Sequence, residues 1–390
     1  MNKFLSEEEL GLRISHISRK VREKGYDAMV ISTNANIYYA TGYVFSGYVY
    51  VAADGNYTFF VHRPVGLEHK NVVYIRKPEQ IAGEMEKAGS KIPEKVAFEL
   101  DRIPYSFALR LAAAFSQKEL LNGSGILSEC RSVKTDYELK KISESGVRHS
   151  MTYGRISGIF HEGMRDKELQ IEIERLLRLD GCLGQFRIAG QTMELFMGNI
   201  LAGDNADCPC PYDFAMGGEG LDGSLPVGCN DSIIRPGNSV MVDMNGNFTG
   251  YMTDMTRTFY VQYVSDEAKA AHRLSIDIHR ALKDFIKPGV EAKEAYSLAK
   301  KMADDAGFGE YFMGHRQQAG FIGHGVGIEV NELPVIAPRS KDVFRKNNVI
   351  AIEPKFVIPG TGAVGIENTY VVTDNGLKCV TNFPEELIEL

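Results

Sequence analysis

The sequence predicts two domains, an α/β domain over residues 1–133 and an α+β domain over residues 134–390. Three observations lead to this prediction. A chain of 390 residues is longer than a single hydrophobic core usually serves. Its N-terminal third alternates helical and strand-like apolar patterns. From Pro226 onward the pattern changes to strands and hairpins that two helices interrupt.

The N-terminal domain begins with an amphipathic pattern. Residues 7–24 repeat apolar side chains every three or four positions, which predicts a helix that Gly25 ends. Residues 27–32 are then expected to form a buried strand. The remaining expected elements are a hairpin around Asp54-Gly55, a strand over residues 96–100 and a helix over residues 105–116.

The second domain should start with helices and continue as a sheet. Its helical patterns begin near Asp136 and cover residues 166–179, 266–286 and 291–306. The segments before and after the last two helices, from Pro226 onward, are typical of strands joined by tight turns. This order of elements is typical of an α+β domain.

Composition and charge exclude several functions. A formal net charge of −7 argues against a nucleic-acid partner. No apolar run approaches the ~20 residues that span a bilayer, and the acidic start of the chain does not resemble a signal peptide. The six cysteines include one close pair, Cys208-Pro-Cys210, whose spacing is not that of a zinc site. We therefore expect reduced thiols and a cytoplasmic location.

Two aspartates are the first candidate ligands. Val240–Val242 reads as a strand that delivers Asp243, Asn245-Gly246 reads as a turn, and a second strand carries Asp254. A hairpin of this kind would bring the two carboxylates side by side, where they would repel each other unless a cation lies between them. The alternative is a pair of ordinary turn or surface aspartates.

The other candidates come later in the chain. His324 stands between two glycines, which leave its imidazole free to reach a ligand. Glu353 is expected at the end of an apolar strand and Glu367 inside the next one, with a turn at residues 359–362. Carboxylates buried in apolar strands are costly without a metal or a basic partner.

Together these residues predict a metal centre with four carboxylates and one imidazole: Asp243, Asp254, His324, Glu353 and Glu367. Two divalent cations would balance the four negative charges. Oxygen and nitrogen ligands suit manganese, iron, cobalt or zinc, and we expect Mn²⁺ first. Two such ions can generate a hydroxide and polarise a carbonyl, which is the chemistry of amide hydrolysis.

The ligand pattern also resembles a known family. The order Asp, Asp, His, Glu, Glu and the segments 254–259, 323–327 and 366–368 are similar to those of the pita-bread metallopeptidases, which include aminopeptidase P, prolidase, methionine aminopeptidase and creatinase. Residues 27–42 resemble the creatinase-type N-terminal domain. The resemblance implies a pita-bread catalytic domain with a curved antiparallel sheet, and Glu353 as the acceptor of the attacking water's proton.

Two of the positions at which the sequence departs from this family bear on catalysis. Family peptidases carry two histidines that assist catalysis without binding metal. Here the first is missing from residues 225–230, and Asn331 occupies the place of the second. An asparagine can donate a hydrogen bond to a substrate carbonyl, but it cannot carry a proton. His315 is a candidate substitute among the substrate-binding residues.

The leading function is therefore a dinuclear-metal hydrolase, an Xaa-Pro aminopeptidase or dipeptidase with weak peptidase activity. One alternative is a non-peptidase hydrolase or lyase that acts on a small cyclic or amidine compound, and the missing histidines favour it. A non-catalytic binding protein is the third alternative. We also expect a homodimer, with an N-terminal domain that shapes substrate access or a dimer contact and supplies no metal ligand.

Overall fold

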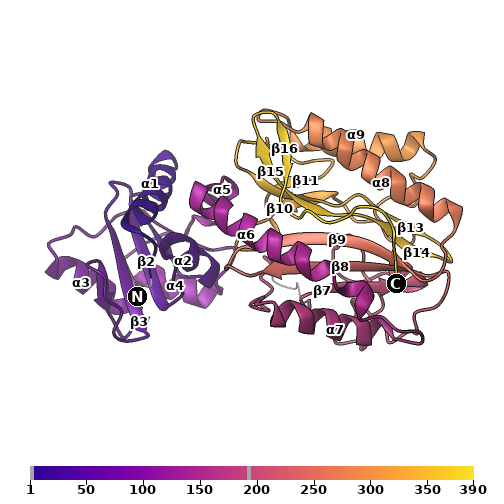
Figure 1. The fold of residues 1–390 in the computed structure, drawn as a ribbon. Helices are drawn as coiled ribbons and strands as arrows, with labels where there is room; N and C mark the ends of the chain where they lie inside the picture. The colour runs from indigo at the N-terminus through magenta and orange to yellow at the C-terminus, as the bar shows by residue number, and fades with distance from the viewer. Residues whose placement is uncertain (1–3, 191–194) are drawn as a thin grey trace. The chain divides into compact units, whose positions relative to one another are not determined.

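The protein is described by a computed structural model in which residues 4–190 and 195–390 are placed. The chain divides into two compact units, Met1–Arg131 and Ser132–Leu390 (Figure 1). The first is an α/β unit and the second an α+β unit, which confirms the predicted fold class. In the described part of the chain, no helix is both long and apolar enough to cross a membrane.

The first unit is built on one six-stranded sheet with the order β4-β3-β2-β1-β5-β6. Strand β1 pairs antiparallel with β2 and parallel with β5. Ser6 caps the N-terminus of helix α1, and its side chain accepts from the backbone N–H of Glu9. The elements are β1 (Ala28–Ile31), β2 (Ser46–Ala52), β3 (Tyr57–Arg63), β4 (Val72–Tyr74), β5 (Val96–Phe98), β6 (Leu121–Asn122), α1 (Glu7–Glu23), α2 (Asn34–Thr41), α3 (Ile81–Lys87), α4 (Tyr105–Ala114) and α5 (Ser124–Ser132).

The second unit holds a four-stranded sheet, β17-β9-β8-β7, a five-stranded sheet, β11-β10-β12-β15-β16, and the β13-β14 hairpin. Its helices are α6 (Asp136–Tyr153), α7 (Asp166–Leu179), α8 (Asp266–Phe285) and α9 (Ala292–Asp305). Its strands are β7 (Gly198–Ala202), β8 (Ser239–Asn247), β9 (Met252–Tyr260), β10 (Gly323–Gly325), β11 (Glu332–Ile336), β12 (Val349–Ile352), β13 (Lys355–Ile358), β14 (Gly362–Gly365), β15 (Asn368–Thr373), β16 (Gly376–Cys379) and β17 (Ile388–Glu389).

Apolar faces hold these layers together. Helices α8 and α9 cover the five-stranded sheet on its outer side, and α7 covers the four-stranded sheet on the opposite side of the unit (Figure 1). The pattern of apolar residues in α8 buries Ala271, Ile278 and Leu282 completely against the strands. The strands therefore face each other between helices, and residues on their inner faces can meet.

The hairpin that carries the two aspartates turns later than predicted. Asn245 and Gly246 lie within β8, where they pair with Asp254 and Thr253 of β9. A Cβ atom on Gly246 would lie 2.6 Å from the ring of His149. The glycine is thus needed for close packing against a helix rather than for a turn, and the expected Asn-Gly turn was wrong.

Candidate metal centre

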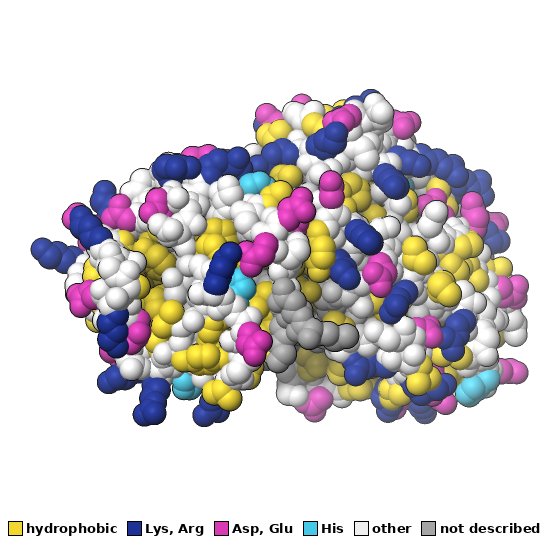
Figure 2. Space-filling view, turned by 60° about the vertical axis from the view of Figure 1, so that its left-hand side comes forward, with side chains coloured by type: hydrophobic (Ala, Val, Ile, Leu, Met, Phe, Trp, Pro, Cys, Tyr) yellow, Lys and Arg dark blue, Asp and Glu magenta, His cyan; other side chains and the backbone are white. Residues whose placement is uncertain are grey.

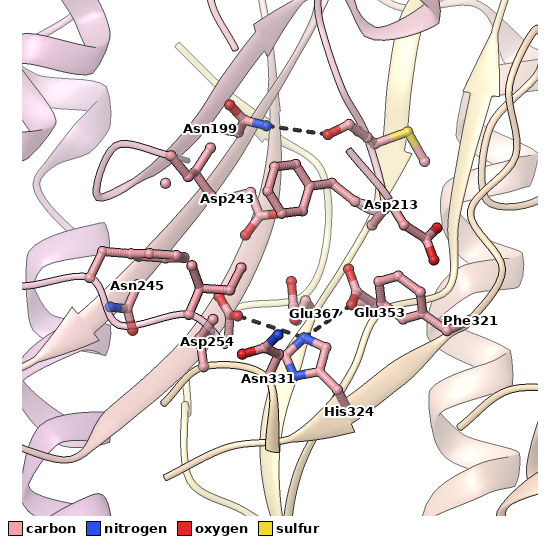
Figure 3. A pocket seen from close by; sticks show the side chains of 18 of the residues that line it. Asn199, Asp213, Asp243, Asn245, Asp254, Phe321, His324, Asn331, Glu353 and Glu367 are labelled. Carbon is pink, nitrogen blue, oxygen red and sulfur yellow. Dashed lines mark hydrogen bonds and ion pairs between the residues drawn. The ribbon is translucent and has the colours of Figure 1, made fainter. Parts of the chain in front are cut away.

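Strands β8 and β9 place Asp243 and Asp254 on the same face of the four-stranded sheet. Asp243 pairs with Thr256 and Asn245 pairs with Asp254, so the two aspartates lie two rungs apart on the ladder. Asp254 is buried, and Asp243 keeps partial exposure. Both side chains point into the cavity drawn in Figure 3.

The five-stranded sheet contributes the other three predicted residues. His324 is the central residue of β10, and its Nε2 lies 3.4 Å from Glu353 Oε1 and 4.0 Å from Asp254 Oδ2 (Figure 3). Glu353 follows β12 directly. Glu367 lies between β14 and β15 rather than inside a strand. The β12–β15 pairing of Ile352 with Asn368 brings the two glutamates together.

A lysine that sequence reasoning missed lies among these carboxylates. Lys355 is the first residue of β13 and is completely buried. Its Nζ donates to Asp243 Oδ2 at 2.8 Å, to Glu353 Oε2 at 2.9 Å and to Glu367 Oε2 at 3.0 Å. An ammonium has three N–H donors, so these contacts use all of them.

Neighbouring side chains hold Glu367 in place. Its backbone exchanges hydrogen bonds with the backbone of Thr256, at 3.1 and 3.3 Å. Arg257, fully buried, donates from Nη1 to the Glu367 carbonyl at 2.9 Å. His279 contacts the preceding carbonyl of Ile366 through Nε2 at 3.1 Å. The other carboxylate oxygen, Oε1, is buried and has no hydrogen-bond partner, which marks it as an acceptor awaiting a donor or a cation.

The charges of the centre are not balanced by the lysine alone. Burial, together with the neighbouring carboxylates, raises the pKa of Asp254 well above its usual value, and burial with Glu353 raises the pKa of Glu367 to about 8. Burial also acts to raise the pKa of Glu353, but Lys355 and His324 hold it at about 2. Negative charge is therefore in excess at Asp254 and Glu367, where a further cation would relieve it.

Two groups of side chains have the spacing to hold an ion. In each group the potential ligand atoms lie within 4.8 Å of one another. We call Asp254, His324 and Glu367 the histidine cluster, and Asp243, Glu353 and Glu367 the carboxylate cluster. The lysine ammonium donates to all three members of the carboxylate cluster. Among the hydrogen bonds of the described residues, its only partner in the histidine cluster is Glu367, which both clusters share.

The centre opens into a cavity of about 300 Å³, a volume suited to a small ligand. Two asparagines in its wall, Asn199 and Asn245, each have a buried side-chain oxygen with no hydrogen-bond partner. Asp213 also lines the cavity. Among the described residues of this wall there is no lysine or arginine, and the apolar part is formed by Phe186, Ile188, Leu195, Phe214, Ala215, Met216, Phe321, Val330 and Val335.

The structure separates the two proposed substrate-binding residues. Asn331 lines the cavity, and its amide pairs with the backbone of Ala189 in both directions, at 2.6 and 2.7 Å. Asn331 therefore holds the segment that carries Ile188 in place. One of the two N–H groups of its amide remains for another partner. His315 is not among the described wall residues. Its Nδ1 lies 2.9 Å from Asp207 Oδ2 instead.

Comparison with known proteins places this centre in a family. Residues 140–374 match metallopeptidase family M24, and residues 13–133 match the creatinase/prolidase N-terminal domain. The first match covers more than half of the chain, and the protein belongs to metallopeptidase family M24. The resemblance found in the sequence is thereby confirmed, together with the pita-bread fold.

Individual relatives span nearly the whole chain. An Xaa-Pro dipeptidase of Pyrococcus horikoshii is 26% identical, with 96% of this chain and 98% of that protein covered. The uncharacterized peptidase YqhT of Bacillus subtilis is 27% identical, with 97% and 100% covered. Among solved structures, an Xaa-Pro dipeptidase from Bacillus anthracis has a TM-score of 0.79 at 25% identity, with 98% and 100% covered.

Proposed function

We propose that this protein is a hydrolase that cleaves an amide bond in a small substrate bearing a free amino group, with Xaa-Pro peptides as the first candidates. The observation that carries the proposal is the convergence of Asp243, Asp254, His324, Glu353 and Glu367 at the floor of one small cavity. Membership of a metallopeptidase family and the Xaa-Pro dipeptidase relatives support it.

The histidine cluster fits a divalent cation. It offers an imidazole and two carboxylates, and Glu367 Oε1 is buried without a partner. An ion bound there would polarise the substrate carbonyl and activate a water, and this oxygen-rich set suits manganese. The carboxylate cluster does not fit a second ion, because the Lys355 ammonium already contacts its three members.

Glu353 is the residue that we propose as the proton acceptor. Lys355 and His324 keep its carboxylate charged at neutral pH, which is the form that can take up a proton. The same contacts lower its basicity, since the best general bases have a pKa near the working pH. We therefore expect a slow hydrolase.

The wall of the cavity favours a substrate that donates hydrogen bonds. Asp213 adds a carboxylate to those of the centre, whereas the unpartnered oxygens of Asn199 and Asn245 are themselves buried. A free amine could pair with the Asp213 carboxylate, whereas a free carboxylate would meet no lysine or arginine among the described wall residues. Recognition of the substrate's amino end is thus proposed over recognition of its carboxyl end.

The same observation favours a second candidate, hydrolysis of a small cyclic amide or amidine, since such compounds also donate hydrogen bonds. A matched screen separates the two. Manganese-loaded protein would be offered Xaa-Pro dipeptides, their C-terminal amides, their N-acetyl forms, and cyclic amides and amidines. We expect cleavage of the free-amine peptides, tolerance of the C-terminal amide and loss of activity on N-acetylation. Turnover of only the cyclic compounds would replace the peptidase proposal by the second candidate.

A further inference from the structure

The Lys355 ammonium lies within the carboxylate cluster, where a metal ion would otherwise be needed to balance the negative charges. Its three carboxylate partners come from different parts of the chain: Asp243 from β8, Glu353 from the end of β12, and Glu367 from the link between β14 and β15. The three N···O distances, 2.8 to 3.0 Å, are those of charge-assisted hydrogen bonds. The ammonium thus performs the charge-neutralising role of a cation in this cluster.

The lysine is built into its position. Its backbone N–H points to Met313 Sδ at 3.5 Å, and its carbonyl accepts from the Met313 N–H at 2.8 Å. It also pairs with Gly365 in the β13–β14 hairpin. The side chain has no exposed surface. An ion could enter the carboxylate cluster only by displacing this ammonium from its three partners, or by sharing the cluster with it against strong repulsion.

We propose that the centre is a hybrid, in which the Lys355 ammonium permanently replaces one of two cations and a single exchangeable divalent ion binds at the histidine cluster. The four carboxylates carry four negative charges, and the ammonium and one divalent ion supply three positive ones. The loaded centre keeps one negative charge, in line with the amine-bearing substrate proposed above. The inference concerns metal binding and does not depend on which bond is cleaved.

The test counts bound ions. Protein freed of metal by a chelator is titrated with Mn²⁺ alone, and the bound ion is measured by equilibrium dialysis with elemental analysis. We expect one Mn²⁺ per chain for the natural protein. Lys355→Met keeps an unbranched side chain, one atom shorter, and removes its charge, so this variant should bind one ion more. Lys346→Met is the matched control, because Lys346 is a largely exposed lysine of the same unit, paired with Asp374, and it should bind one ion like the natural protein.

A second variant locates the added ion. Asp243→Asn should leave the count unchanged in the natural background and should return the Lys355→Met variant to one ion. Two tightly bound ions in the natural protein, no bound ion, or a Lys355→Met variant that folds and binds no more than the natural protein would each overturn the proposal.

Unpaired carboxylates could prevent the Lys355→Met variant from folding, so the natural protein supplies an independent readout. A single bound Mn²⁺ gives the electron paramagnetic resonance spectrum of an isolated ion at every loading. A pair of ions a few ångströms apart gives a spin-coupled spectrum, and its appearance as Mn²⁺ is added would overturn the proposal without any variant. Neither measurement uses a substrate, so a failed screen for substrates leaves this result unaffected.

Discussion

The Thr256 hydroxyl donates a 2.8 Å hydrogen bond to Glu367 Oε2, the same oxygen that the Lys355 ammonium contacts at 3.0 Å. One oxygen of this carboxylate is therefore occupied by two donors, while Oε1 is buried without a partner. The hydroxyl and the ammonium fix the carboxylate in an orientation that leaves Oε1 for an incoming ion.

Thr256→Val should weaken the binding of Mn²⁺ about tenfold, because a hydrogen bond to a charged group is worth ~1.5 kcal/mol or more. The measurement is a Mn²⁺ titration of metal-free protein. Thr258→Val is the control, since it removes similarly buried hydrogen bonds, to the Gly365 carbonyl and from the Gly365 N–H, on the same strand. Equal Mn²⁺ affinities in the two variants would contradict an orienting role for Thr256.

Asp254→Ala should abolish tight binding of Mn²⁺, because it removes one of the three members of the histidine cluster. In the natural protein, Mn²⁺ at a hundred times its dissociation constant should stabilise the fold by about 2.7 kcal/mol, and a chelator should reverse this gain. Thermal unfolding with and without Mn²⁺ measures both effects. Asp213→Asn, in the wall of the same cavity, should keep the full stabilisation by Mn²⁺. If this variant lost the stabilisation, general charge attraction would explain Mn²⁺ binding instead.

Asn331→Ala should raise KM more than it lowers kcat. The side chain pairs with both backbone groups of Ala189, so its loss releases a segment of the cavity wall without touching the proposed proton acceptor. Steady-state kinetics on an Xaa-Pro substrate gives the two parameters. A fall in kcat at unchanged KM would instead place Asn331 at the reacting carbonyl.

Acid should destabilise the fold partly through buried histidines. Burial lowers the pKa of His279 to about 3, and those of His149 and His272 to about 3 and 4. As pH falls below about 6.5, the unfolded chain takes up these protons first. The stability that the neutral rings contribute is therefore complete above that pH and is lost toward pH 3.

His279→Gln isolates one of these contributions. The natural protein should have a higher free energy of unfolding than this variant at pH 6. That difference should fall by about 1.4 kcal/mol per pH unit between pH 6 and 4. Urea unfolding at several pH values measures it. A difference that does not change with pH would show that folding leaves the pKa of His279 unchanged.

Much of the architecture could be predicted from local patterns. Helix α7 begins and ends where the apolar spacing indicated, and the α/β and α+β texture of the two units followed from the order of the elements. The place of Asn245 and Gly246 inside a strand could not be predicted, because the pairing of β8 with β9 and the packing of His149 override the turn preference of the two residues.

The candidate centre was only partly accessible from sequence. The carboxylates and His324 were found because ligand residue types stand out in apolar strands. Lys355 was missed although a signal existed: it follows Glu353 by two positions, and residues two apart on an extended chain share a face. The pairing of Asn331 with Ala189 could not be found, since it joins segments that no local pattern connects.

The covalent attachment of Lys355 separates the folding of the centre from the supply of metal. A free ion reaches a site according to its concentration and leaves when a stronger ligand competes for it. An ammonium carried by the chain arrives with synthesis, and no chelator can remove it. The carboxylates of β8, β12 and the β14–β15 link can therefore come together around Lys355 before any metal is present. A shortage of metal would then abolish activity without unfolding the protein.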